Sequence, residues 1–263
     1  VLIIVQVIDL ICFLLFVSTS VEAQKKSRKM IKADQAFSVE QYNKAAELYK
    51  KAYQSAKSRA VKSEIIFKQA ECYRLSGNKK RAESYYKRAI KAKYPDVLVY
   101  LRYADILRMN EKYEEAKLQY QKYIQLNPTD VSGEMGLKSC DYALSWLSNP
   151  TRYQVELMPL INSRFSDFSP SFGNGEYSEV FFTSSRSGGF SNKIDDRTGE
   201  TFTDIYSSKL NKKGKWSVPT MLAEPINSAG NEGSVVLNKR GTTMYFTKCD
   251  VQKKKSLGCN IYV

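Results

Sequence analysis

The sequence contains no histidine among its 263 residues. Histidine is the general base of Ser-His-Asp and Cys-His catalysis and the commonest metal ligand, so its absence excludes both kinds of catalysis and most zinc sites from this chain. The five cysteines have neither CxxC nor any other metal-site spacing. We therefore expect a protein that is not an enzyme, with no catalytic residue, no metal and no cofactor.

Acidic residues are scarce relative to basic ones: 27 against 41, a formal net charge of +14. Residues 24–148 carry 26 bases and 14 acids, whereas residues 1–23 carry two acids and no base. The positive field therefore belongs to the middle of the chain. Such a field could attract nucleic acid, an anionic membrane or an acidic polymer, or it could serve only to keep the protein soluble.

The chain begins with a long apolar run, VLIIVQVIDLICFLLFVSTSVEA, interrupted by Asp9. Val21 and Ala23 have the small-residue spacing that signal peptidase prefers before Gln24, which predicts a secretory signal peptide over residues 1–23. An uncleaved membrane anchor and a core helix are the alternatives. Export would remove nucleic acid as a partner, so we expect none.

Two cysteines near the end of the sequence flank a basic segment. Cys249 and Cys259 enclose DVQKKKSLG, which predicts a polar loop between two strands. An exported protein can form disulfides, so we expect one between these two residues, with free thiols as the alternative. Cys72 and Cys140 lie in helical patterns and are expected to be small buried hydrophobic residues.

Residues 28–128 have a helical period and repeat three times. Ala45, Ala82 and Ala116 come into register at spacings of 37 and 34 residues. A small residue precedes each alanine at an equivalent point and a tyrosine follows it: Ala33, Ala70 and Ala104 before, Tyr49, Tyr86 and Tyr120 after. This pattern resembles the tetratricopeptide repeat family, whose helix pairs approach closely at small residues. The resemblance implies a helical solenoid over residues 24–148, with the helical stretch from Asp130 to Leu147 as its capping helix.

Members of this family bind proteins in a groove lined by the first helix of each pair. Aligned on the repeat, that helix carries one acidic residue in each copy and an aromatic or basic residue three positions later. The predicted groove residues are Asp34, Phe37, Glu71, Arg74, Asp105 and Arg108. We expect a protein partner there, although the i, i+3 acid and base pairs also allow mutual neutralisation. The Lys/Arg/Asn pattern with which some members clamp a C-terminal carboxylate is not visible.

From residue 149 to 263 the period changes from 3.6 to 2, and a second repeat begins. INS occurs at residues 161–163 and again sixty-five residues later at 226–228. Phe182-Thr183 matches Phe246-Thr247, and residues 204–206 match residues 260–262. One unit predicts four strands, SPSF, EVFFTSS, DIYSSKL and WSVPTMLAEPINS. These runs resemble blades of the PD40, or TolB-like, β-propeller, with the usual SPDG turn altered.

Two blades cannot close a ring, because propellers use four to eight. Residues 153–163, YQVELMPLINS, resemble the outer fourth strand, so we expect them to be a closing strand. The expected fold is thus α + β and multidomain: a tetratricopeptide-repeat solenoid followed by the first blades of an incomplete PD40-type β-propeller over residues 149–263.

Taken together, this order of modules resembles PorE-type OmpA-family envelope proteins of the Bacteroidota. The resemblance implies a non-enzymatic, outer-membrane-associated periplasmic scaffold linking components of the type IX secretion or gliding apparatus to the cell wall. Protein partners would bind the helical groove and the propeller face, and peptidoglycan would bind only through an OmpA-like domain that this sequence lacks. The alternative is a propeller-containing peptidase or glycosidase whose catalytic domain is missing, for which Asp167, Asp204 and Glu232 are the candidate acids.

Overall fold

The computed structural model describes residues 26–173, 175–252 and 255–263. The expected cleavage before Gln24 therefore lies outside the described residues. No helix in the described part of the chain is long and apolar enough to span a bilayer.

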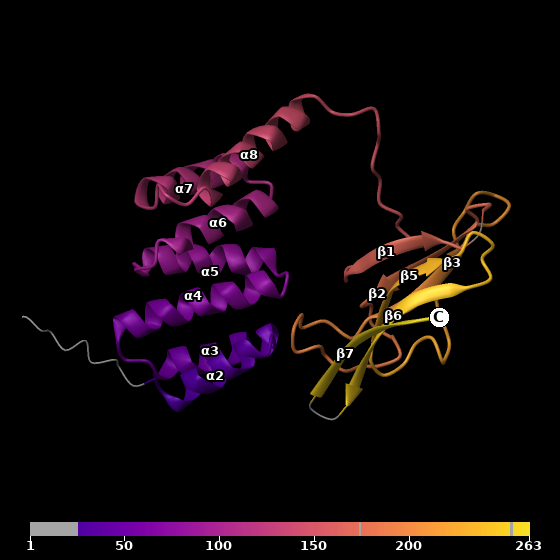
Figure 1. Ribbon diagram of the computed structural model, residues 1–263, viewed down its shortest axis with the longest axis horizontal. Helices are drawn as coiled ribbons and strands as arrows, with labels where there is room; N and C mark the ends of the chain where they lie inside the picture. Colours follow the sequence, from indigo (N-terminus) through magenta and orange to yellow (C-terminus); the bar gives the residue numbers. More distant parts are fainter. Residues whose placement is uncertain (1–25, 174, 253–254) are drawn as a thin grey trace, which may run out of the picture.

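The first half is a stack of helices that run back and forth in chain order (Figure 1). The described helices are α2 (Arg28–Ser38), α3 (Tyr42–Ser55), α4 (Arg59–Leu75), α5 (Lys79–Lys91), α6 (Leu98–Met109), α7 (Tyr113–Leu126) and α8 (Ser132–Ser148). They form the three expected helix pairs, α2–α3, α4–α5 and α6–α7, followed by α8. The helical solenoid expected from the repeat is thus confirmed.

Small residues and tyrosines hold these pairs together as the repeat predicts. The six aligned alanines are fully buried, and so are Tyr49, Tyr86 and Tyr120. An alanine lets two helix backbones approach, and the ring of a tyrosine fills the space beside it. The last helix packs in the same way, because Gly136 lies against the ring of Tyr120.

The second half is a pair of antiparallel sheets. The first has the order β1 (Asp167–Phe172), β2 (Glu179–Ser184), β3 (Asp204–Lys209) and β4 (Thr220–Met221), and the second the order β5 (Asn231–Leu237), β6 (Met244–Gln252) and β7 (Lys255–Tyr262). Four strands were expected in the first unit and four are found. Phe181 and Ile205 of the first sheet share a core with Val235 and Phe246 of the second, so the two sheets pack on one another.

The sixty-five-residue repeat is also a repeat of backbone geometry. Ser169 in β1 and Ser234 in β5 both have a left-handed φ, 51° and 52°, and each lies within an irregularity of the strand register. The Phe182–Tyr206 pair of the first sheet corresponds to Phe246–Tyr262 of the second, and both pairs stack, at 6.0 and 5.8 Å between centroids. The two sheets are therefore copies of one unit, although the described residues form no closed ring.

One expectation about this half stays a prediction and another is wrong. Residues 153–163 lead irregularly from α8 to β1 and pair with no strand of the described residues (Figure 1), so the closing role expected of them in a complete ring stays a prediction. The basic segment after Cys249 is not simply a loop, because β6 and β7 continue past the cysteines through the pairs Val251–Ser256 and Gln252–Lys255. Cys249 and Cys259 face each other within this ladder and form a disulfide with an S–S distance of 2.07 Å.

A loop of the β half touches the start of α3. The carbonyl of Asp196 accepts hydrogen bonds from the backbone N–H groups of Asn43 and Lys44, at 2.9 and 3.4 Å. The first N–H groups of a helix lack partners within it, and Gln41 gives α3 no side-chain cap, so the β half supplies the missing acceptor. An exposed ion pair between Arg197 and Glu40, 3.3 Å, lies beside this contact.

Candidate functional site: the inner row of the helical repeats

One carboxylate of each repeat accepts a hydrogen bond from a tyrosine fifteen residues later. We call Asp34, Glu71 and Asp105 the carboxylate row. The hydroxyl of Tyr49 donates to Asp34 Oδ1 at 2.6 Å, and that of Tyr120 donates to Asp105 Oδ1 at 2.7 Å. The hydroxyl of Tyr86 donates to Glu71 in the same way. The row therefore joins the first helix of each pair to the second.

In the middle repeat the carboxylate is fully engaged. Arg74 Nη2 donates to Glu71 Oε2 at 2.7 Å, and Arg74 Nε donates to the hydroxyl of Tyr86 at 3.2 Å. Burial raises the pKa of Tyr86 strongly, and the adjacent Glu71 carboxylate raises it further. The tyrosine thus remains a hydroxyl donor, and the expected Glu71–Arg74 pair is found.

The outer repeats vary this arrangement. Asp105 pairs with Arg102 at 3.8 Å, while Arg108, its expected partner, donates from Nε to Tyr120 at 3.2 Å. Asp34 has no arginine three residues later and accepts instead from Lys26 Nζ at 2.7 Å. Burial alone would raise the pKa of Asp34, but the hydrogen bonds from Lys26 and Tyr49 lower it.

These contacts define what the predicted groove residues can offer a partner. The side chains of the carboxylate row are 27%, 13% and 29% exposed in chain order, so each is mostly covered by its own repeat. Phe37 lies edge-on to Tyr42 at 5.5 Å, with Lys68 Nζ 5.5 Å from its ring centroid. The six residues thus have internal partners, and contact with another protein stays a prediction for them.

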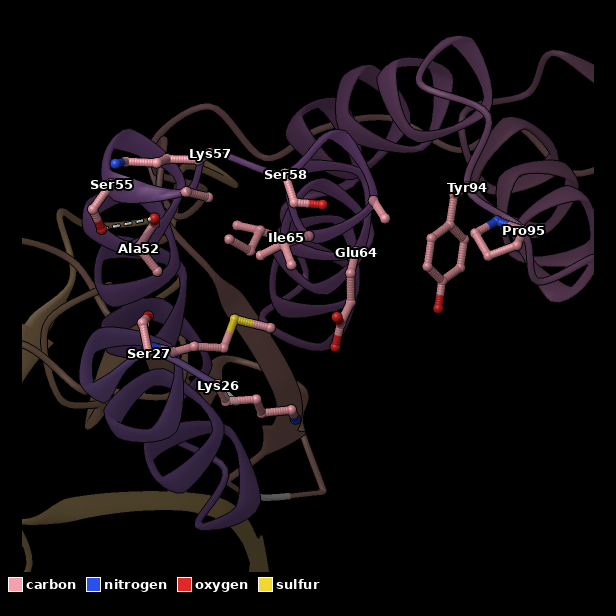
Figure 2. Close-up of a pocket in the computed structure, with 14 residues that line it drawn as sticks. Lys26, Ser27, Ala52, Ser55, Lys57, Ser58, Glu64, Ile65, Tyr94 and Pro95 are labelled. Carbon is pink, nitrogen blue, oxygen red and sulfur yellow. Dashed lines mark hydrogen bonds between the residues drawn. The ribbon is translucent and has the colours of Figure 1, made fainter. Parts of the chain in front are cut away.

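A hollow of about 640 Å³ lies at the N-terminal ends of α2 and α4 (Figure 2). We call it the inner hollow. Its lining comes from the start of α2, the end of α3 with the turn after it, the first turns of α4 and the connection between α5 and α6. The lining residues are Lys26, Ser27, Met30, Ala52, Ser55, Ala56, Lys57, Ser58, Ala60, Val61, Glu64, Ile65, Tyr94 and Pro95.

The inner hollow combines apolar walls with charges of both signs. Met30 and Ile65 contribute buried apolar side chains, and Tyr94 is held by stacking on Phe67 at 4.4 Å with an angle of 12° between the rings. Glu64 and Tyr94, which come from different elements, both project beside the hollow in Figure 2. Lys26 lines the hollow and also donates a hydrogen bond to Asp34, the first carboxylate of the row, so the hollow and the row are adjacent. Such a site suits an apolar side chain flanked by polar main chain.

Sequence reasoning missed the inner hollow because its residues come from separate elements. One signal existed: Ser27 and Glu64 precede Asp34 and Glu71 by seven residues, which is two helical turns on the same face. The carboxylate row could have been extended in that direction. The position of Tyr94 follows only from the packing of the second and third helix pairs.

Two of the candidate acids of the β half are held by neighbouring side chains. Asp167 accepts from Ser184 Oγ at 2.6 Å and pairs with Arg186 at 2.8 Å. Glu232 occupies the equivalent place sixty-five residues later and accepts from Ser228 Oγ at 2.5 Å.

Asp204, the third candidate, is almost fully buried. Its Oδ2 accepts from the N–H of Phe190 at 3.0 Å, while its Oδ1 has no hydrogen-bond partner among the residues that the structure describes. Burial raises the pKa of Asp204 to about 6. The three acids therefore present no open pair of carboxylates, and the described residues hold no cluster suited to a metal ion.

Comparison with known proteins supports the repeats. Residues 63–95 and 97–130 match the family model described as "Tetratricopeptide repeat". These two segments correspond to α4–α5 and α6–α7, so the second and third helix pairs are tetratricopeptide repeats. No curated protein sequence matches the chain.

Three solved structures each align with just under half of this chain. The Hsp90 co-chaperone Cns1 from Saccharomyces cerevisiae is 20% identical over 46% of this chain and 39% of its own, with a TM-score of 0.43. The myosin chaperone UNC-45 from C. elegans in complex with an Hsp90 peptide is 19% identical over 48% of this chain and 14% of its own, with a TM-score of 0.43. The first tetratricopeptide domain of Spaghetti (RPAP3) bound to the HSP90 peptide SRMEEVD is 23% identical over 49% of this chain and 99% of its own, with a TM-score of 0.42. The chain thus spans well under half of the first two.

Proposed function

We propose that this protein is a non-enzymatic scaffold whose helical half binds an extended segment of another protein. The observation that carries the proposal is the inner hollow, which lies beside the carboxylate row on tetratricopeptide-type helices. An extended peptide would place one apolar side chain against Met30, Ile65 and Tyr94, with its main chain near Lys26 and Glu64. Phe37, Arg74 and Arg108 would border its path.

The β half is proposed as a second recognition module, formed from PD40-type propeller blades. The repeated serine geometry and the repeated Phe–Tyr pair support this, because blades of a propeller are copies of one antiparallel sheet that pack face to face. Its loops, rather than a cleft, would carry specificity.

The compartment proposed is the periplasm, in association with the outer membrane. The signal-like residues 1–23 support export, and the Cys249–Cys259 disulfide independently suits an oxidising compartment. The finer proposal, a PorE-type scaffold linking secretion or gliding components to the cell wall, rests on the order of modules. The arrangement of Asp167, Asp204 and Glu232 favours this scaffold over the alternative hydrolase, because Asp167 and Glu232 each accept a hydrogen bond from a serine of the β half and Asp204 is almost fully buried.

Peptide selection tests the proposal for the helical half. A displayed library of random peptides would be selected on the chain, and enriched peptides measured by fluorescence anisotropy against the parent and Val61→Arg, which puts a charge into the inner hollow. We expect Val61→Arg to weaken binding about tenfold or more. The matched control is Leu118→Arg on α7, an exposed apolar position outside the hollow. A library that yields no binder, or binders that ignore Val61→Arg, would reject the proposal.

A further inference from the structure

The last helix of the solenoid is apolar on both sides. Its inner face carries the buried Gly133, Gly136 and Cys140. Its outer face, together with the N-cap residue Val131 just before it, carries four large apolar residues, each 63–73% exposed: Val131, Met135, Tyr142 and Trp146. We call these four the outer stripe. A helix that ends a solenoid normally turns a polar face outward, because nothing follows to cover it. The outer stripe therefore marks α8 as a contact surface.

The outer stripe is symmetric along the helix. Met135 and Tyr142 lie at equal distances from the midpoint between Lys138 and Ser139, and so do Val131 and Trp146. If a second α8 ran antiparallel about a two-fold axis at this midpoint, each member of a pair would meet the other member across the interface. Two-fold interfaces are self-complementary in this way, whereas a different partner needs no such symmetry.

The polar centre of the stripe is compatible with this pairing. Lys138 of each copy would lie near the axis. Glu134 lies about one turn earlier on a neighbouring flank of α8, so the Glu134 carboxylate of one copy would offer an opposite charge to Lys138 of the other copy. Ser139, a small exposed residue, leaves room for the two helices to approach at the axis. Asp141 is already engaged by Lys117 at 2.7 Å and stays outside the pairing.

We propose that two copies of this chain associate through antiparallel packing of their α8 helices on the outer stripe. The pairing would place the two helical halves back to back at their α8 ends, so that each keeps its inner hollow, at the opposite end of the stack in Figure 1, open. The scaffold would then present two identical binding sites, which raises its avidity for a partner with repeated segments.

Sedimentation velocity of the full chain over a wide concentration range tests the association. The parent is expected to form a concentration-dependent dimer. Trp146→Glu should raise the dissociation constant of the dimer about tenfold or more, because a carboxylate would be buried opposite Val131 of the second copy. The control Leu118→Glu changes an equally exposed apolar residue on α7 and should leave the dimer intact.

Cysteine cross-linking tests the direction of packing. Under mild oxidation Ser139→Cys, beside the axis, should form a disulfide with its own counterpart, and peptide mapping would locate it. Ser145→Cys, nearly two turns away, should not, because antiparallel packing carries the two copies of residue 145 to opposite ends. A monomeric parent, a dimer insensitive to Trp146→Glu, or self-linking at residue 145 would each overturn the proposal. If the parent is a monomer, the outer stripe would instead be covered by the apolar residues 153–160 of the same chain or by another protein.

Discussion

At the scale of single residues, the helical half depends on polar contacts that span each helix pair. The sequence alone predicted the Glu71–Arg74 pair, since residues three apart on a helix are neighbours. It could not predict the bonds from Tyr49, Tyr86 and Tyr120 to the carboxylate row, because a separation of fifteen residues becomes a contact only once two helices fold back on each other.

The hydroxyl of Tyr86 gives the clearest test of these contacts. Tyr86→Phe keeps the buried ring but leaves Glu71 and Arg74 without their shared partner. We expect the free energy of unfolding to fall by about 1–3 kcal/mol, the usual cost when a buried charged group loses a hydrogen bond. The matched control is Tyr142→Phe on the exposed face of α8, which should change stability by less than about 0.5 kcal/mol. Urea unfolding would measure both, and equal effects would contradict the account.

Asp204 should make the β half less stable as the pH rises. Burial raises the pKa of this carboxyl to about 6 from 3.8, and the charge of Glu232 adds to the rise while the Phe190 N–H opposes it. Because the folded state binds the proton more tightly, the stabilising contribution is complete below about pH 3.8 and is lost as the pH rises through 6. The full difference is on the order of 3 kcal/mol.

Asp204→Asn removes this titration while keeping an acceptor for the Phe190 N–H. The variant should therefore be more stable than the parent at pH 7.5 and nearly equal to it at pH 4. Urea unfolding at the two pH values measures the difference. Parallel pH profiles for the two proteins would show that Asp204 does not titrate in this range.

At the scale of elements, periodicity predicted the seven described helices and the order of the strands, because each element buries one face with its own period. Periodicity did not predict which segments pair with a neighbouring strand. Residues 153–163 have strand composition but pair with no strand edge in the described part of the chain, whereas Val251, Gln252, Lys255 and Ser256 belong to a segment of loop composition and yet pair in the ladder of β6 and β7. A segment forms a strand only when it can hydrogen-bond with a neighbouring strand, and its amino-acid composition alone does not show whether such a neighbour is present.

The contact of α8 with α7 is tight enough to reverse an ordinary helix preference. Alanine in place of glycine normally stabilises a helix by about 1 kcal/mol. At Gly136, however, a Cβ would lie 2.2 Å from Cε1 of Tyr120, whose ring is fully buried and whose hydroxyl is held by Asp105.

Gly136→Ala should therefore lower the free energy of unfolding by about 1–3 kcal/mol. Ser139→Ala, on the exposed face of the same helix, should leave it unchanged or slightly raised. Thermal unfolding followed by circular dichroism compares the two variants. A stabilised Gly136→Ala would mean that α8 does not pack closely on Tyr120.

At the scale of the whole molecule, the two halves have separate cores and meet at few polar groups around Asp196. The sequence predicted both halves but neither their contact nor the inner hollow, since both arise between elements far apart in the chain. Residues 24–148 alone should unfold in one cooperative transition at the temperature of the helical transition in the full chain. Calorimetry of the fragment and of the full chain would check this, and a fragment that fails to fold would show that the helices need the β half.

The central claim is that a partner segment binds in the inner hollow beside the carboxylate row. Hydrogen–deuterium exchange of the full chain, with and without a peptide selected on it, tests this most directly. The account predicts new protection at the start of α2, at the start of α4 and around Tyr94, where the lining residues lie. Protection confined to the β half or to α8, with these segments unchanged, would contradict it.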